Sequence, residues 1–274
     1  VVEAVYGILQ ALVPNLGVLW VSYIKAGMGD ARGTYINRNH FAGLIEMLLP
    51  LLLGFSLSRV KWGHRIRFKV LLNSEHLHQH ILMVLALVVL TLALLFSKSR
   101  GGITGAFIGL FVFFMFMRGE AKKMPLGVWL IFALFCALTL FYGFRIGFMP
   151  IIERFLEIDQ GNSRLDYWRD SLAIIARHPM GIGLTAFKNV FPIYDHSSLT
   201  DRTMAVYLHN DVLQLLVEAG WIGFLAVTGS FAFFMRVSFV RIRRLNAAAD
   251  PQRFFIAAGA YAGLCAMAFH SFLD

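Results

Sequence analysis

The residue best suited to proton transfer is His209, in the segment YLHNDVLQLLVEAG that runs from Tyr207 to Gly220. Asn210 follows it, and because Asn is favoured as an N-cap, we expect a helix to begin here with His209 at its positive end. That position disfavours imidazolium, so the imidazole should stay neutral and able to accept a proton. The alternative is a histidine at a membrane interface with no chemical role. Glu218 lies close to an expected helix break at Gly220, where its carboxylate can orient a neighbouring group.

Two further segments contain candidate site residues. Lys98 and Arg100 lie in FSKSRGGITG, a short glycine-containing turn between two apolar segments. Arg164 and Trp168 lie on adjoining turns at the start of a predicted helix in SRLDYWRDSLAII. Capture of an anionic ligand is one interpretation of Lys98 and Arg100, because arginine binds phosphate through bidentate, charge-assisted hydrogen bonds. For Lys98 and Arg100 the alternative is that the long side chains snorkel to lipid headgroups.

A third polar group stands at the start of an apolar helix in GTYINRNHFAG. Its members are Asn37, Arg38, Asn39 and His40. An Asn at this place is a good N-cap, so the group is either a plain helix start at the membrane surface or part of a substrate site. Glu46 lies one to two turns further on. Because a carboxylate at that depth in a membrane is costly, we expect Glu46 to face protein or water rather than lipid.

The segments between these residues are too apolar for a water-soluble domain. Apolar residues make up 58% of the 274-residue chain and charged residues only 15%, unlike the composition of a soluble domain. A helix needs about 20 apolar residues to cross the hydrocarbon core. We therefore predict an all-α polytopic membrane protein with about seven transmembrane helices, forming a single transmembrane domain over 1–274. The predicted spans are Ala4–Ile24, Phe41–Ser58, Ile81–Phe96, Ile103–Met117, Met124–Phe144, Trp221–Met235 and Phe254–Leu273.

The charges in the loops orient these spans. Thirteen Lys and Arg against three acidic residues fall in every second loop, namely 59–80, 118–123 and 236–253. Short cytoplasmic loops carry an excess of Lys and Arg, so these three loops are predicted to be cytoplasmic. The other loops then face the outer side, and 145–208 is the large one that carries the chemical segments. The net charge of +9 is therefore interpreted as an orientation signal, and no nucleic-acid partner is expected.

The large loop contains two further patterns. Leu165, Trp168, Leu172 and Ile175 recur every three or four residues, which predicts an amphipathic helix on or near the membrane surface that ends before Pro179. MGIGLTAF lacks the preceding strand and the third glycine of a dinucleotide fingerprint, so it is predicted to be a turn. No carboxylate pair or zinc ligand set stands out in the sequence, and we expect no metal and no cofactor.

Four pieces of the sequence, taken in order, resemble the O-antigen ligase and Wzy polymerase superfamily of bacterial envelope glycosyltransferases. They are NRNHFAG, SRGG, SRLDYW followed by HPMGIG, and LHNDVLQLLVEAG; they lie between Gly33 and Gly220, and FHSFLD at the end of the chain also fits. Each piece alone is weak, but their order and their placement on one side of the membrane combine into a specific signal. The resemblance implies inverting, metal-independent transfer of a glycan from undecaprenyl diphosphate, on the periplasmic face of the inner membrane.

The resemblance also implies roles for single residues. By motif match, Arg100 and Arg164 hold the lipid diphosphate, and His209 activates the acceptor hydroxyl as general base. The other residues of these motifs that we expect in the substrate site are Lys98, Asn39, His40, Arg38, Trp168, Asn210 and Glu218. Members of the family usually carry more spans, several of them ahead of NRNH, which leaves open that this chain is a fragment of a longer protein.

These residues do not identify the acceptor molecule. A lipid A core sugar would make the protein an O-antigen ligase, a carrier-linked repeat an O-antigen or exopolysaccharide polymerase, and a Ser or Thr a protein O-glycosylation enzyme. A transporter or flippase of lipid-linked sugars is the alternative from another class, because it could use the same arginines without breaking a bond. Such a transporter should show polar or glycine-broken spans at matching places in two halves, and the sequence shows no such repeat.

Overall fold

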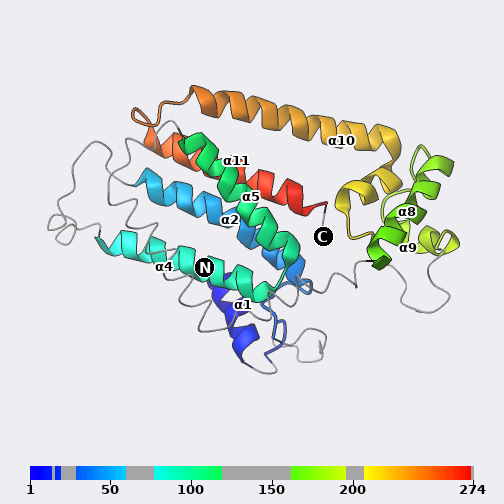
Figure 1. Ribbon diagram of the computed structural model, residues 1–274, viewed down its shortest axis with the longest axis horizontal. Coiled ribbons are helices and arrows are strands. Elements are labelled where there is room, and N and C mark those ends of the chain that lie inside the picture. The colour runs from blue at the N-terminus through cyan, green and yellow to red at the C-terminus, as the bar shows by residue number, and fades with distance from the viewer. Residues whose placement is uncertain (14–15, 20–28, 60–76, 119–161, 196–206, 273–274) are drawn as a thin grey trace. The chain divides into compact units, whose positions relative to one another are not determined.

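The computed structural model describes residues 1–13, 16–19, 29–59, 77–118, 162–195 and 207–272 (Figure 1). The described part of the chain is helical and contains no β-strand. The helices fall into two compact units, which we describe separately. The first unit consists of Val1–Arg154 and Phe239–His270, and the second of Phe155–Ser238 and Ser271–Asp274.

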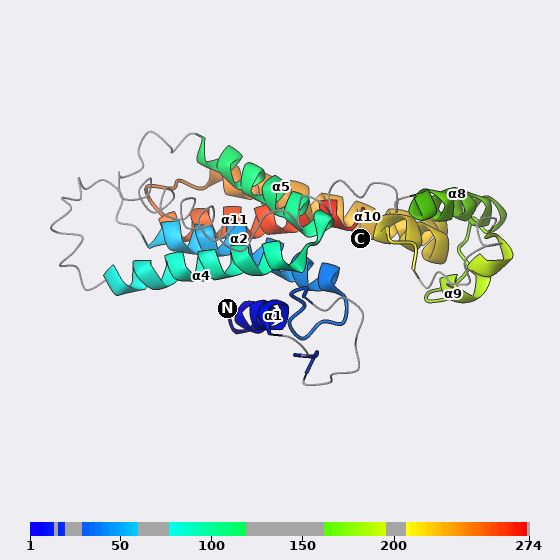
Figure 2. The same cartoon turned by 60° about the horizontal axis from the view of Figure 1, so that its bottom comes forward.

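The first unit is built around a central helix, α2 (Arg38–Ser58). It packs against α4 (Leu77–Ser97), α5 (Arg100–Met117) and α11 (Pro251–His270), and it lies between α4 and α11 in Figure 1. The short helix α1 (Val2–Leu12) lies beside α4, as Figure 2 shows. The last part of α10 (Asp211–Arg244) also belongs to this unit.

Small residues allow α2 and α11 to approach closely. A Cβ on Gly263 would lie 2.6 Å from the carbonyl oxygen of Met47, and one on Gly259 would collide with that of Pro50. The alanines between and beside these glycines, among them Ala258 and Ala262, are completely buried. Lipid tails are as apolar as leucine side chains, so helices in a membrane associate through such close packing rather than through the hydrophobic effect.

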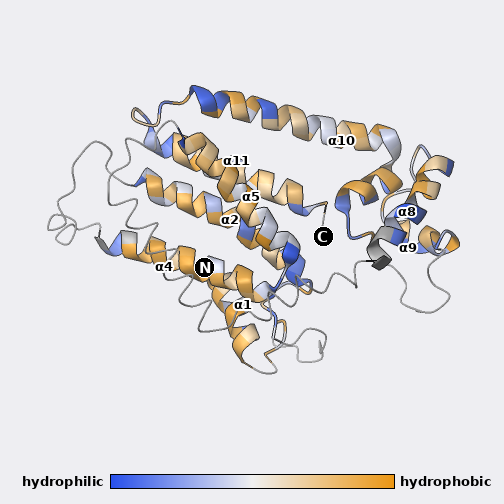
Figure 3. Ribbon diagram, viewed as in Figure 1, coloured by the Kyte–Doolittle hydropathy of each residue, from blue (hydrophilic) through white to orange (hydrophobic). Residues whose placement is uncertain are grey.

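Four described helices, α2, α5, α10 and α11, are long and apolar enough to cross a membrane. Figure 3 shows apolar residues along α2, α5 and α11, and a cluster of hydrophilic residues near the C-terminal end of α10. The protein is therefore a multi-pass membrane protein. Helix α4 covers the predicted third span, while the predicted fifth span, Met124–Phe144, lies outside the described residues.

The expected first span, Ala4–Ile24, is wrong as one continuous helix. Helix α1 ends at Leu12, and Val13 is already extended. Its 11 residues would cover roughly half of the hydrocarbon thickness. Pro14 follows directly in the sequence, and a proline cannot donate the hydrogen bond that would continue the helix.

The second unit has its own small hydrophobic core. It contains α8 (Asn162–Arg177), α9 (Phe187–Val190), the 3-10 turn η3 (Phe191–Ile193) and α10 as far as Ser238. The buried members of the core are Ile174, Phe187, Phe191, Tyr194, Leu208 and Val217. Of the predicted large loop 145–208, residues 145–161 and 196–206 lie outside the described part.

Helix α8 forms where an amphipathic helix was predicted, and Trp168 and Ile175 of the predicted apolar face pack against the core, but Leu172 of that face does not. Leu172 is 59% exposed, whereas Ile174 is completely buried. Tyr167 packs edge-on against Phe191, which turns the side of α8 that carries Tyr167 and Ile174 toward the core. The spacing of apolar residues alone could not distinguish these two faces, because both contain residues three or four apart.

Candidate active site

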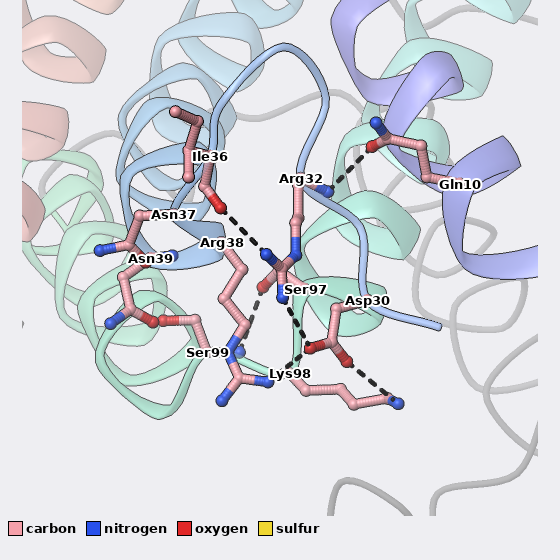
Figure 4. A network of polar contacts seen from close by, with 10 residues as sticks. All are labelled: Gln10, Asp30, Arg32, Ile36, Asn37, Arg38, Asn39, Ser97, Lys98 and Ser99. Atoms are coloured by element: carbon pink, nitrogen blue, oxygen red, sulfur yellow. Dashed lines mark hydrogen bonds and ion pairs between the residues drawn. The ribbon is translucent and has the colours of Figure 1, made fainter. Parts of the chain in front are cut away.

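A buried carboxylate gathers three cations in the first unit (Figure 4). Asp30 Oδ2 lies 2.6 Å from Arg38 Nη1, and Asp30 Oδ1 lies 3.2 Å from Lys98 Nζ. Arg32 Nη2 is 3.8 Å from Asp30 Oδ2. One acidic and three basic groups leave an excess of two positive charges in this cluster. Burial lowers the pKa of the Arg32 guanidinium; Asp30 opposes that shift and Arg38 adds to it.

The loop that carries Asp30 and Arg32 is fixed to neighbouring helices. Gln10 of α1 accepts a hydrogen bond from the Arg32 backbone N–H and donates one to the Gly33 carbonyl. The Ala31 N–H donates to the carbonyl of Phe96, at the end of α4. Arg32 also donates through Nη1 to the carbonyl of Ile36, within its own loop. These bonds fix the backbone on both sides of the two charged side chains.

The NRNH group begins helix α2 as expected. The Asn37 side chain accepts a hydrogen bond from the Asn39 N–H, so the predicted Asn N-cap is confirmed. Arg38 is the first residue of the helix and turns to Asp30. The His40 side chain is exposed. Among the residues predicted to bind substrate here, Arg38 belongs to the charged cluster.

The SRGG turn places Lys98 and Arg100 between two helix ends. Lys98 has a left-handed backbone with φ 51°, an uncommon conformation for a residue with a side chain. Ser99 caps α5 by accepting a hydrogen bond from the Gly102 N–H, and Arg100 is the first residue of that helix. Lys98 is paired with Asp30, at 3.2 Å between Nζ and Oδ1.

A second buried ionisable pair lies beside this turn. Glu46 Oε1 of α2 is 3.1 Å from His270 Nδ1 at the end of α11, and both side chains are almost completely buried. The prediction that Glu46 faces protein rather than lipid is confirmed. A Cβ on Gly101 would lie 2.7 Å from the His270 ring, and one on Gly105 would lie 2.5 Å from Glu46 Oε2. Gly101 and Gly105, in the first two turns of α5, thus make room for the pair.

In the second unit, hydrogen bonds fix the backbone on both sides of His209. Its φ is 54°, in the left-handed region. The carbonyl of the preceding residue, Leu208, accepts a hydrogen bond from Trp168 Nε1 at 3.0 Å. The N–H of Leu208 donates to Gln214 Oε1 at 3.2 Å. A left-handed non-glycine residue costs about 1–3 kcal/mol, so it persists only where neighbouring contacts enforce it.

Asn210 fixes the other side of His209. Its Oδ1 accepts a hydrogen bond from the Leu213 N–H at 2.9 Å, and its carbonyl accepts from Gln214 N. Asn210 is therefore the N-cap of α10, and the prediction that a helix begins here with His209 at its positive end is confirmed. The Asp211 N–H donates to the carbonyl of Ser271, within the same unit.

Glu218 is a buried hub of hydrogen bonds. Its carboxylate accepts from the backbone N–H groups of Thr185 and Phe187, at the start of α9. Gln214 Nε2 donates to Glu218 Oε1 at 3.4 Å. Because Gln214 also holds the Leu208 N–H, Glu218 acts on the backbone ahead of His209 through one intermediate side chain.

Backbone N–H groups of the HPMGIG segment form hydrogen bonds to the carbonyls at the break in α10. Gly220 has a non-helical backbone, so the carbonyls of Val217 and Glu218 lose their usual partners in the helix. Ile182 N–H donates to the former at 3.1 Å, and Gly183 N–H donates to the latter at 3.0 Å. The interpretation of this segment as a turn and the helix break expected at Gly220 are both confirmed.

The predicted site residues thus fall into two sets. Arg38, Asn39, His40, Lys98 and Arg100 belong to the first unit, and Arg164, Trp168, His209, Asn210 and Glu218 to the second. The backbone of Arg164 lies in the first turn of α8, while its side chain lies outside the described part of the structure. Within each set the structure gives the contacts described above; their roles toward a substrate remain predictions.

The sequence interpretation missed Asp30, Arg32, Gln214 and His270. Asp30 and Arg32 flank Ala31 in GDARG, where an acidic and a basic residue close together give only a weak local signal. Gln214 stands one helical turn after Asn210, a spacing that does indicate a shared helix face. His270 lies in an apolar helix, and an ionisable residue in such a helix is itself a signal for a buried partner.

Neither unit shows a metal-binding arrangement in its described residues: no three His, Cys, Asp or Glu side chains gather there. The first unit offers a cluster with excess positive charge, which suits an anion. The second offers an imidazole at a helix N-terminus, which suits proton transfer.

The apolar helices are those of a multi-pass membrane protein, with charged and polar side chains in the segments between them. A family model described as O-antigen ligase matches residues 85–228, which is more than half of the chain. The chain belongs to this family of membrane glycosyltransferases, whose substrates are a lipid-linked glycan and an acceptor. No curated protein and no solved structure gives a significant match.

Proposed function

We propose that the protein transfers a glycan from undecaprenyl diphosphate to an acceptor hydroxyl, on the periplasmic face of the bacterial inner membrane. The family supplies the reaction class, and the geometry around His209 supports a catalytic role for it. The supporting observation is that His209 is held in a left-handed conformation by Trp168 and Gln214 on one side and by the Asn210 cap on the other. Strained residues of this kind are concentrated at functional sites.

In the proposed reaction His209 is the general base. The acceptor hydroxyl gives its proton to the neutral imidazole while its oxygen forms a bond to the anomeric carbon of the donor. The bond from that carbon to the diphosphate oxygen breaks, and the diphosphate leaves with the electron pair. Attack and departure on opposite sides of the carbon invert its configuration. The position of His209 directly ahead of a helix N-terminus favours the neutral imidazole that this step requires.

Cationic side chains then stabilise the charge that develops on the leaving diphosphate. We assign this role to Arg100 and Arg164, and an accessory binding role to Arg38 and Lys98. Guanidinium groups at a partly dry site bind phosphate oxygens in a bidentate manner. Because these groups supply the positive charge, the proposed transfer does not depend on a divalent cation.

The remaining predicted residues shape the site. Trp168, Asn210 and Glu218 position the backbone of His209 through the hydrogen bonds described above. Asn39 and His40, at the start of α2, are proposed to contact the donor. The acceptor is a lipid A core sugar in a ligase or another carrier-linked glycan in a polymerase.

The test uses the full chain, purified in detergent, with a defined undecaprenyl-diphosphate glycan as donor and EDTA present. Lipid A core or the same donor serves as acceptor. Glycan on lipid A core identifies a ligase, and longer carrier-linked chains identify a polymerase. Donor binding without transfer to either acceptor contradicts both assignments and favours a transporter of lipid-linked sugars or a protein acceptor.

A further inference from the structure

The cluster around Asp30 is arranged so that its negative charge is covered and its positive charges are accessible. The Asp30 side chain is 6% exposed, whereas those of Arg32, Arg38 and Lys98 are 15%, 22% and 27% exposed. An anion that approaches from solvent therefore meets the three cations before it meets the carboxylate. Among the ion pairs of the described residues, Asp30 is the acidic partner of all three cations, and two positive charges remain in excess.

The three cations come from three separate places in the first unit. Arg32 lies in the loop ahead of α2, Arg38 in the first turn of α2, and Lys98 in the turn between α4 and α5. Like charges gathered around one carboxylate repel one another, so the three cations need an opposite charge between them. Asp30 uses both of its oxygens to hold them: Oδ2 faces the two arginines, and Oδ1 faces the lysine.

Arg32 shows the electrostatic cost of this arrangement. Its Nη1 donates to the Ile36 carbonyl and its Nη2 faces Asp30, while its buried Nε has no hydrogen-bond partner among the described residues. Burial lowers the pKa of Arg32, so the protein holds a cation where solvent does not fully stabilise it. A bound anion would stabilise it further.

From this geometry we infer that Asp30 is a positioning residue that assembles Arg32, Arg38 and Lys98 into a site for the diphosphate of the lipid carrier. The inference rests on the proposed function and adds two residues, Asp30 and Arg32, to the donor site. A diphosphate diester carries one negative charge on each phosphate, which matches the two excess charges. A single-phosphate lipid headgroup would leave one of them uncompensated, so the cluster should prefer the diphosphate.

The loss of the Asp30 charge and the loss of its positioning role should change anion binding in opposite directions, so Asp30→Asn distinguishes the two effects. The substitution makes the cluster more positive, so attraction alone would strengthen binding of an anion. If Asp30 positions the cations, its removal lets them separate and weakens binding. Asp30→Glu keeps the charge but moves the carboxylate by one methylene, so it should also weaken binding if position matters.

The experiment measures the Kd of a defined undecaprenyl-diphosphate glycan, which is the diphosphate diester, for the purified full chain in detergent micelles, with phosphatidylglycerol as the single-phosphate comparison. We expect at least about tenfold weaker diphosphate binding in Asp30→Asn, a smaller loss in Asp30→Glu, and a loss of the preference over phosphatidylglycerol. Asp250→Asn is the matched control, because Asp250 pairs with Arg253 at an exposed helix start where Asn can also serve as N-cap.

A double-mutant cycle distinguishes positioning from a general loss of fold. If Asp30 acts through Arg38, adding Asp30→Asn to Arg38→Ala should weaken diphosphate binding by much less than Asp30→Asn does alone. Equal or tighter binding in Asp30→Asn, or full additivity in the cycle, would overturn the inference while leaving the proposed function intact. If the wild-type protein bound no undecaprenyl-diphosphate glycan, both would be overturned. Should Asp30→Asn fail to fold, a cycle of Asp30→Glu and Arg38→Ala tests the positioning role, and full additivity in that cycle would overturn the inference.

Discussion

Gly181 and Gly220 lie backbone against backbone in the second unit. Their φ angles are 86° and 65°, both in the left-handed region. A Cβ on Gly181 would collide with the Glu218 carbonyl, and a Cβ on Gly220 would collide with the backbone of Met180. The two glycines therefore belong to one structural feature, although 38 residues separate them in the sequence.

Gly181→Ala and Gly220→Ala should each destabilise the second unit by about 2 kcal/mol or more, because each combines a strained backbone with a collision against backbone atoms. The measurement is thermal unfolding in detergent. Gly229→Ala is the control: Gly229 lies in α10 with open space around its Cα, so the alanine should raise helix stability slightly. A small effect of Gly220→Ala, similar to that of Gly229→Ala, would show that the close approach is not required.

Trp168→Phe should lower the rate of glycan transfer. The phenylalanine retains much of the aromatic packing but loses the hydrogen bond from Nε1 to the Leu208 carbonyl, which fixes the backbone ahead of His209. Loss of one such bond is worth about 1 kcal/mol, or roughly a fivefold decrease in kcat/KM. Trp221→Phe is the matched control, since Trp221 is 48% exposed on α10. Equal effects of the two substitutions would argue against a positioning role for Trp168.

Gly101→Ala should disturb the SRGG turn through its contact with His270. The new Cβ would lie 2.7 Å from the imidazole, which is buried against Glu46 and has little room to move. Overpacking of this kind costs about 1–3 kcal/mol. Combining it with His270→Ala removes the collision, so the double variant should lose less stability than the two single variants predict. Simple additivity of the two losses would be inconsistent with the contact.

The features that the sequence predicted correctly depend on local chemistry. The Asn37 and Asn210 caps follow from the preference of a short polar side chain for a helix start, and the break at Gly220 follows from the conformational freedom of glycine. The burial of Glu46 followed from the cost of exposing a carboxylate to lipid.

The features that the sequence did not predict depend on which segments meet in space. Asp30 acquires its importance from Arg38 and Lys98, which come from two other elements, so no local pattern identifies it. The buried face of α8 is likewise decided by its contacts with α9 and η3. The end of α1 at Leu12 was overlooked because an apolar stretch was interpreted as a span despite the following proline.

The central claim is that His209 acts as general base, and His209→Asn tests it most directly. Asn tolerates a left-handed backbone, so this variant retains the backbone conformation at position 209 while the imidazole is removed. We predict that glycan transfer falls at least about 100-fold while the Kd for undecaprenyl diphosphate stays within roughly a factor of two. Transfer at the wild-type rate by His209→Asn would contradict the account.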